Sequence, residues 1–180
     1  MQLVGLKSVH AGEPLPKGVK DDGAAALMAE YIEIMKPYKG GISLNFSNPS
    51  SNKFYREGEA LPFFSMVDPT SGEKNITWNV ADFDDIDEKD AQGNILKEST
   101  MTFYFGTTEP LKGEVYEGTK GFVFETASGK SIAFARLKYS ATLSGGINDS
   151  DPLQISVTAE VLTPAEGGVA WWPIDTPKWE

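Results

Sequence analysis

Residues 131–164 contain two long runs in which apolar and polar side chains alternate, and these runs flank a single loop. Strict alternation over more than four residues is typical of a β-strand, because successive side chains on a strand point to opposite faces. The loop is rich in Gly, Asn, Asp and Pro, which accept the backbone dihedrals of a turn. The pattern therefore predicts a hairpin of two strands at residues 132–143 and 153–162. Both are longer than an average strand of about five or six residues.

The second of these strands has one apolar and one polar face. The apolar side chains are Leu153, Ile155, Val157, Ala159 and Val161. The polar side chains on the opposite face are Gln154, Ser156, Thr158 and Glu160. Unbroken alternation through the first strand places Arg136 and Lys138 on the same face as Ile132 and Phe134. It places Ala133, Ala135, Leu137 and Tyr139 on the other face. A strand pair of this kind turns its polar face to water, to another subunit or to a water-filled channel.

Shorter runs predict the remaining strands, at residues 3–9, 42–46, 53–57, 60–67, 75–80, 101–105 and 121–126. In residues 75–80 the apolar side chains point inward while Thr77 and Asn79 point outward. The acid-rich residues 81–92 break this pattern and predict a short amphipathic helix, since carboxylates suit a helix N-terminus. With roughly nine strands and no regular β-α-β alternation, the fold expected is a mainly β, antiparallel sandwich or barrel. One short helix flanks it, and several loops are long.

A single domain over residues 1–180 fits the length of the chain. Residues 10–28 are rich in Gly, Pro and charged side chains and are predicted to form a loop or an arm. The C-terminal tail, at residues 165–180, holds three of the four tryptophans: Trp171, Trp172 and Trp179. Tryptophan near a chain terminus either covers the protein's own core or anchors it to another protein. The sequence leaves both roles open.

Residues that carry chemistry are sparse. The chain has no cysteine and a single histidine, His10, which excludes a disulfide framework, thiolate metal sites and a cysteine nucleophile. Residues 129–131 read GKS, like the end of a phosphate-binding loop, but the first glycine of that motif would fall at Phe124. The acids of residues 82–90 miss the spacing of a calcium loop, whose fifth position is Ile86 here. The sequence therefore predicts no enzyme, no metal and no cofactor.

The formal net charge is −10, and it is uneven. Residues 81–126 alone carry eleven acids and four bases. An acidic chain without a basic cluster is a poor candidate for gripping nucleic acid, because phosphate binding depends on Lys and Arg. No basic segment followed by a long apolar run is evident, so neither a signal peptide nor a membrane span is expected.

Six segments follow one another in a distinctive order: MQLVGLKSVHAGEP, FYREGE, ITWNVADFD, TFYFG, IAFARLKYSATLS and ISVTAEVLTP. In this order and spacing, which extend over nearly the whole chain, the sequence resembles the major tail tube proteins of tailed bacteriophages and prophages. The resemblance implies a β-sandwich whose copies close into rings, usually six-fold, that stack into a tube around a channel for DNA. It implies a protein of the virion tail, made in the bacterial cytoplasm. Its partners would be itself and other tail proteins, and DNA would pass without specific binding during genome ejection.

The resemblance also suggests roles for the residues noted above. The residues that face the channel would be Gln154, Ser156, Thr158 and Glu160. The residues at subunit interfaces would be Trp171, Trp172 and Trp179. A tail-end or baseplate ring protein, or a type VI secretion-like tube protein, would have the same fold. A protein of another class, a monomeric carbohydrate-binding β-sandwich, would use the same tryptophans as sugar platforms. The lack of a secretion signal argues against that last alternative.

Overall fold

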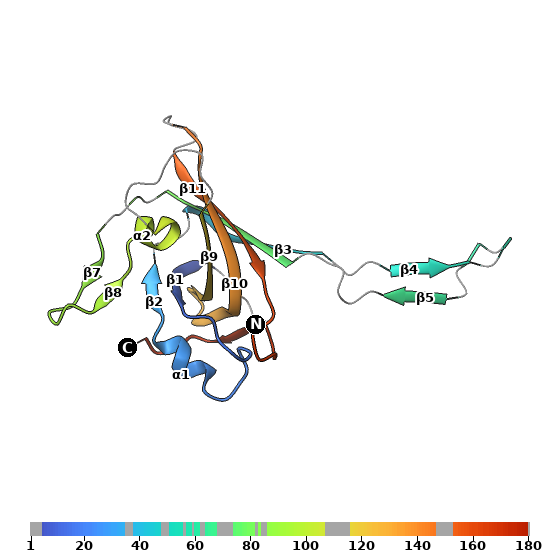
Figure 1. Cartoon of the computed structure of the whole chain (residues 1–180), viewed down its shortest axis with the longest axis horizontal. Helices are drawn as coiled ribbons and strands as arrows, with labels where there is room; N and C mark the ends of the chain where they lie inside the picture. Colours follow the sequence, from blue (N-terminus) through green and yellow to red (C-terminus); the bar gives the residue numbers. More distant parts are fainter. Residues whose placement is uncertain are drawn as a thin grey trace.

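The computed structural model describes residues 5–34, 38–47, 51–55, 57–58, 60–61, 64–67, 74–81, 83, 86–106, 116–146 and 153–179. These residues form twelve β-strands and two short helices (Figure 1). The strands are β1 (Leu6–Gly12), β2 (Ile32–Ile34), β3 (Tyr38–Phe46), β4 (Ser51–Phe54), β5 (Phe64–Val67), β6 (Lys74–Val80), β7 (Glu88–Lys89), β8 (Ile95–Lys97), β9 (Tyr116–Thr126), β10 (Lys130–Ser144), β11 (Gln154–Val161) and β12 (Trp171–Asp175). The helices are α1 (Ala24–Ala29) and α2 (Thr100–Phe105). Within the described chain, neither helix is long and apolar enough to span a membrane.

Ten of the strands form one sheet, in the order β3-β6-β11-β10-β9-β1-β2-β8-β7, with β12 beside β10. Neighbouring strands are antiparallel except for β2 and β8, so the sheet is mixed rather than purely antiparallel. The predicted long hairpin is confirmed, because β10 and β11 pair from Leu137 opposite Val161 to Ser144 opposite Gln154. The prediction of a mainly β protein is confirmed as well. The described strands form one large curved sheet and a separate two-stranded hairpin of β4 and β5.

A β-bulge divides the longest strand, β10. Its pairing with β9 shifts register between Phe134 and Leu137. A bulge adds one residue to one strand, so inward and outward positions exchange beyond it. The apolar residues of β10 consequently line one core on both sides of the bulge: Ile132, Phe134, Leu137, Tyr139 and Ala141. The expectation that Arg136 and Lys138 continue the face of Ile132 is therefore wrong.

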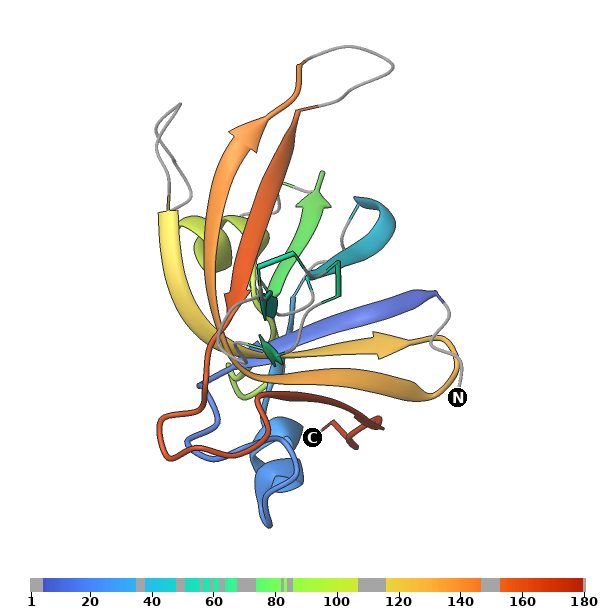
Figure 2. The same cartoon turned by 90° about the vertical axis from the view of Figure 1, so that its right-hand side faces the viewer.

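The sheet curves along β9 and β10, and both of its halves contribute to one hydrophobic core (Figure 2). Residues of β1 and β2 from one half meet residues of β6 and β11 from the other. Aromatic rings fill the centre, where Trp78 lies edge-on to Phe122 and Phe124 at centroid distances of 5.7 and 5.6 Å. The prediction that Ile76, Trp78 and Val80 point inward is confirmed, since all three are buried.

Helix α2 covers one end of this core and was predicted as a strand. Ser99 is its N-cap, and the Ser99 hydroxyl accepts a hydrogen bond from the backbone N–H of Thr102 at 3.3 Å. Gly106 ends the helix in the left-handed conformation, with φ of 67°. Of its six residues, all but Thr102 are buried. The predicted strand at residues 101–105 is therefore wrong, because local caps and burial on several sides favour a helical turn.

The helix predicted at residues 81–92 is also wrong for the part that the structure describes. That part contains the short strand β7 and a turn, and none of its described residues is helical. The Asp90 carboxylate accepts hydrogen bonds from the backbone N–H groups of Gln92 and Asn94, each at 2.8 Å. These bonds fold the chain back toward β8. Glu88 and Asp90 thus belong to a hairpin rather than to the first turn of a helix.

A second layer covers the outer side of β1, β9 and the first half of β10. It is built from residues 13–31, which include α1, and Ile174 and Trp179 from the C-terminal residues pack against it. The backbone N–H of Leu15 donates to the Ala135 carbonyl at 2.8 Å, and that of Val19 donates to the Val169 carbonyl at 2.9 Å. The predicted arm at residues 10–28 therefore packs on its own sheet, and His10 lies within β1.

Two hairpins leave the body of the sheet on opposite sides in Figure 1. The hairpin of β4 and β5 extends far beyond the end of β3, and the hairpin of β7 and β8 lies at the other side. Both carry exposed apolar side chains, among them Tyr55 and Leu61 near the first and Ile86 and Leu96 in the second. Strands β4 and β5 overlap the short strands predicted at residues 53–57 and 60–67 only in part, because residues 57, 58, 60 and 61 are not in strands.

Candidate functional site: a polar sheet face and a C-terminal strap

The outer side of β3, β6, β11, β10 and β9 forms one polar surface, called here the polar face. Strand register aligns its residues in rows that cross the sheet. One row consists of Glu117, Ser140, Thr158, Thr77 and Ser43. The members of the polar face among the described side chains are Ser43, Asn45, Asn75, Thr77, Asn79, Glu117, Thr119, Lys138, Ser140, Thr142, Ser144, Gln154, Ser156, Thr158 and Glu160.

Twelve of these fifteen side chains are uncharged Ser, Thr, Asn or Gln. Some of them bond to one another: the Ser144 and Ser156 hydroxyls lie 2.5 Å apart, and the Ser156 hydroxyl donates to Asn79 Oδ1 at 3.1 Å. The residues between them on β11 and β6 point into the core and are buried: Ile155, Val157, Ala159, Ile76 and Trp78. The polar face is thus a surface of exposed and half-buried polar side chains over a buried apolar core.

The three charged residues of the polar face lie together. Lys138 Nζ is 3.6 Å from Glu117 Oε2, and Glu160 is the cross-strand neighbour of Lys138 on β11. With Ser140 and Thr158 they line a shallow depression of about 270 Å³. One lysine and two glutamates leave the face with a charge of −1. Among the described residues of the face, the only cation is therefore already paired with the Glu117 carboxylate.

The structure brings the four predicted channel residues onto this single face. Gln154 and Ser156 are half-buried, while Thr158 and Glu160 are exposed. The alternation of apolar and polar residues along β11 was enough to predict that these four side chains share one face. The same alternation along β6 was enough to predict that Thr77 and Asn79 point outward. The residues of the polar face on β3 and β9 were not predicted, because only the strand order of the folded sheet shows that these strands lie beside β6 and β10.

The second candidate region is the C-terminal strap, residues 171–179, and its three tryptophans have different environments. Trp171 is half-buried and covers the core, with its ring centroid 5.0 Å from that of Phe46 and 6.2 Å from that of Phe134. Trp172 points away from the core and is 46% exposed. Lys20 Nζ lies 3.6 Å from the centroid of the Trp172 ring, a distance at which a cation–π contact is favourable.

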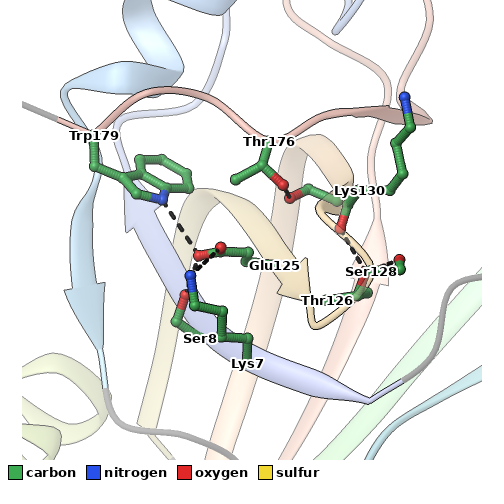
Figure 3. A network of polar contacts seen from close by, with 9 residues as sticks. Lys7, Ser8, Glu125, Thr126, Ser128, Lys130, Thr176 and Trp179 are labelled. Atoms are coloured by element: carbon green, nitrogen blue, oxygen red, sulfur yellow. Dashed lines mark hydrogen bonds and ion pairs between the residues drawn. The ribbon is translucent and has the colours of Figure 1, made fainter.

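Trp179, at the other end of the strap, lies over a network of polar contacts (Figure 3). Its indole stacks on the imidazole of His10, with centroids 3.6 Å apart and planes 6° from parallel. The indole N–H also donates to Glu125 Oε2 at 3.4 Å. Glu125 is buried and accepts two further hydrogen bonds, from Lys7 Nζ and from the Ser8 hydroxyl, each at 2.7 Å.

This environment changes the pKa values of both buried groups. Burial alone would raise the pKa of Glu125, but the hydrogen bonds from Lys7 and Ser8 outweigh it, so that pKa lies below its ordinary value. Burial lowers the pKa of His10 to about 4, against the opposing charge of Glu125. At neutral pH the network therefore holds an ionised carboxylate and a neutral imidazole. Sequence reasoning did not predict this cluster, because Lys7 and Glu125 are far apart in the chain.

Among the described residues, no group of three or more histidine, aspartate or glutamate side chains is arranged to hold a metal ion. Comparison with known proteins adds no relative: no protein-family model matches the chain, and no curated protein matches it. The function therefore has to be argued from the geometry of the polar face and the strap.

Proposed function

We propose that this chain is a major tail tube subunit of a phage or prophage virion. Copies of the chain assemble into rings, which stack into a tube with other tail proteins at its ends. The polar face lines the channel through which DNA passes during genome ejection. The observation that carries the proposal is the polar face itself, which extends across five strands and holds twelve uncharged polar residues.

A wall along which duplex DNA slides has to be hydrated and poor in free cations. DNA carries about one negative charge per 1.7 Å, and its affinity for proteins comes largely from Lys and Arg on its phosphates. The polar face offers hydroxyl and amide groups, and Lys138, the lysine among its described residues, is paired with Glu117. The net charge of −10 adds a general repulsion between the subunit and DNA. Both features favour passage without adhesion.

The sheet also has the edges that ring formation requires. Strand β3 ends the sheet next to the polar face, with β6 as its neighbour. An edge strand presents backbone N–H and C=O groups that pair readily with another chain. Strand addition between copies would continue the polar face from one subunit to the next and close it into a barrel.

Two alternatives from the same class, a tail-end or baseplate ring and a type VI secretion-like tube, use the same geometry and belong to the same proposal. A monomeric carbohydrate-binding protein is a weaker candidate. Its sugar platform would need several exposed tryptophans, whereas Trp171 and Trp179 pack against Phe134 and His10. Only Trp172 among the three tryptophans of the strap offers a largely free ring, and Lys20 lies over it.

The proposal is tested by electron microscopy of the purified protein at rising concentration, together with a single cysteine label. Because the chain has no cysteine, Thr158→Cys places the only thiol on the polar face. We expect rings or tubes, in which a small maleimide labels Thr158→Cys but a maleimide on a long polymer does not. In dilute subunits both reagents should react. A persistent monomer, or tubes in which the bulky reagent reacts as fast as in free subunits, would contradict the proposal.

A further inference from the structure

The C-terminal strap covers a histidine that is unusually short of polar partners. His10 is only 5% exposed, and its Nδ1 has no hydrogen-bond partner in the described part of the chain. The Trp179 indole lies flat against the imidazole at 3.6 Å. A buried polar atom without a partner costs free energy, since it has lost its hydrogen bonds to water. The closed strap therefore keeps His10 in an environment that suits only a neutral ring.

Charged and titratable groups face His10 from three strands. Glu33 on β2 is its cross-strand neighbour, Glu125 comes from β9, and Lys7 comes from β1 itself. The Glu125 carboxylate and the indole face favour a protonated imidazole, whereas burial and the charge of Lys7 oppose it. Burial is the strongest of these effects, and it keeps the pKa of His10 near 4. Glu125 is already engaged by Lys7 and Ser8, so it offers limited compensation.

The Trp179 end of the strap is held by side-chain contacts to His10 and Glu125 rather than by strand pairing. Backbone pairing of β12 with β10 and the Ser131–Thr176 hydroxyl contact of 2.8 Å hold the rest of the strap. Trp179 lies three residues beyond Thr176 and borders a cavity of about 350 Å³. The cavity is lined by Lys7, Ser8, His10, Tyr31, Glu33, Leu96, Glu125 and Trp179. Release of the indole would open His10 to water without breaking the β12 ladder.

We propose that the C-terminal strap is a proton-sensitive latch, closed by Trp179 over neutral His10 and released at that end when His10 takes up a proton. This device does not depend on the proposed function. A histidine whose pKa is lowered in the closed form stabilises that form above the ordinary pKa of 6.5. The stabilisation is lost as the pH falls from 6.5 toward 4. At pH 5 the open fraction should exceed that at pH 8 on the order of tenfold.

The state of the latch can be followed at His10, the single histidine of the chain, and at two of the three tryptophans of the strap. In an NMR titration of the full chain, the His10 ring signal should show a midpoint well below 6.5. Hydrogen exchange of the Trp179 indole N–H, expressed as a protection factor, should fall about tenfold between pH 8 and pH 5. Trp172 belongs to the same strap but does not contact His10, so its indole protection should stay constant and serves as the internal control.

Two variants distinguish release of the latch from a general loss of structure at low pH. His10→Phe keeps a stacked ring without a titrating group, so its Trp179 protection should stay constant down to pH 5. Trp179→Leu should move the His10 midpoint toward 6.5 and provides the test if His10→Phe does not fold. The latch is refuted if wild-type His10 titrates at 6.5 or above, if Trp179 protection does not change, or if His10→Phe loses protection as the wild type does. An unmoved His10 midpoint in Trp179→Leu refutes it as well.

Discussion

At the scale of single residues, the contact between Trp78 and Tyr104 joins the sheet to α2. The Trp78 indole N–H donates to the Tyr104 hydroxyl at 2.9 Å, and both side chains are buried. Tyr104→Phe removes the acceptor while keeping the ring, so the indole N–H stays buried without a partner. We expect a loss of about 1–3 kcal/mol in the free energy of unfolding, measured by urea denaturation. Tyr55→Phe, at a side chain that is 53% exposed, should change it by less than about 0.5 kcal/mol. Equal losses in the two variants would contradict this role.

At the scale of elements, α2 depends on its N-cap more than a longer helix would. It has only six residues, and isolated helices of that length are not stable in water. Ser99→Ala removes the hydroxyl that accepts from Thr102, so we expect the protein to lose about 1 kcal/mol of stability. Ser43→Ala, at an exposed position on β3, is the matched control and should cost much less. If thermal melts place the two variants together, packing alone holds the helix.

The same element marks the limit of prediction from sequence. Alternation was enough for β6, β11 and the half of β10 beyond the bulge, since there one face of each strand meets the core and the other forms the polar face. In residues 101–105 the same two-residue period led to the wrong prediction of a strand, because Met101, Phe103 and Phe105 are buried together with Tyr104. The sequence of these residues has no polar side that would indicate a helix, although Ser99 and Gly106 occupy the two cap positions. The bulge between Phe134 and Leu137 was equally hidden, because it appears only in the pairing with β9.

At the scale of the whole molecule, one side of the sheet is divided between two uses. Residues 13–31, together with Ile174 and Trp179 of the strap, cover the half formed by β1, β9 and the start of β10, with Val123, Ala133 and Ala135 beneath them. The half formed by β3, β6, β11 and the end of β10 is polar, and none of the described residues of the second layer packs on it. The same side of one strand, β10, thus changes from apolar to polar along its length. In the proposed tube, this division would keep each subunit folded on its own while leaving the polar half for the channel.

The charges of the polar half lead to a prediction for the assembled protein. Wild-type tubes should not retain linear duplex DNA even at low salt, because Lys138 is paired with Glu117 and lies opposite Glu160. Neutralising both acids in a Glu117→Gln and Glu160→Gln variant leaves Lys138 as an unpaired cation in every subunit. Copies around a ring would then act together, so we expect retention of DNA at low salt that is lost as salt rises. Adding Lys138→Gln should abolish that retention and shows whether the lysine is responsible. Micromolar binding by wild-type tubes, lost at higher salt, would contradict a non-adhesive channel.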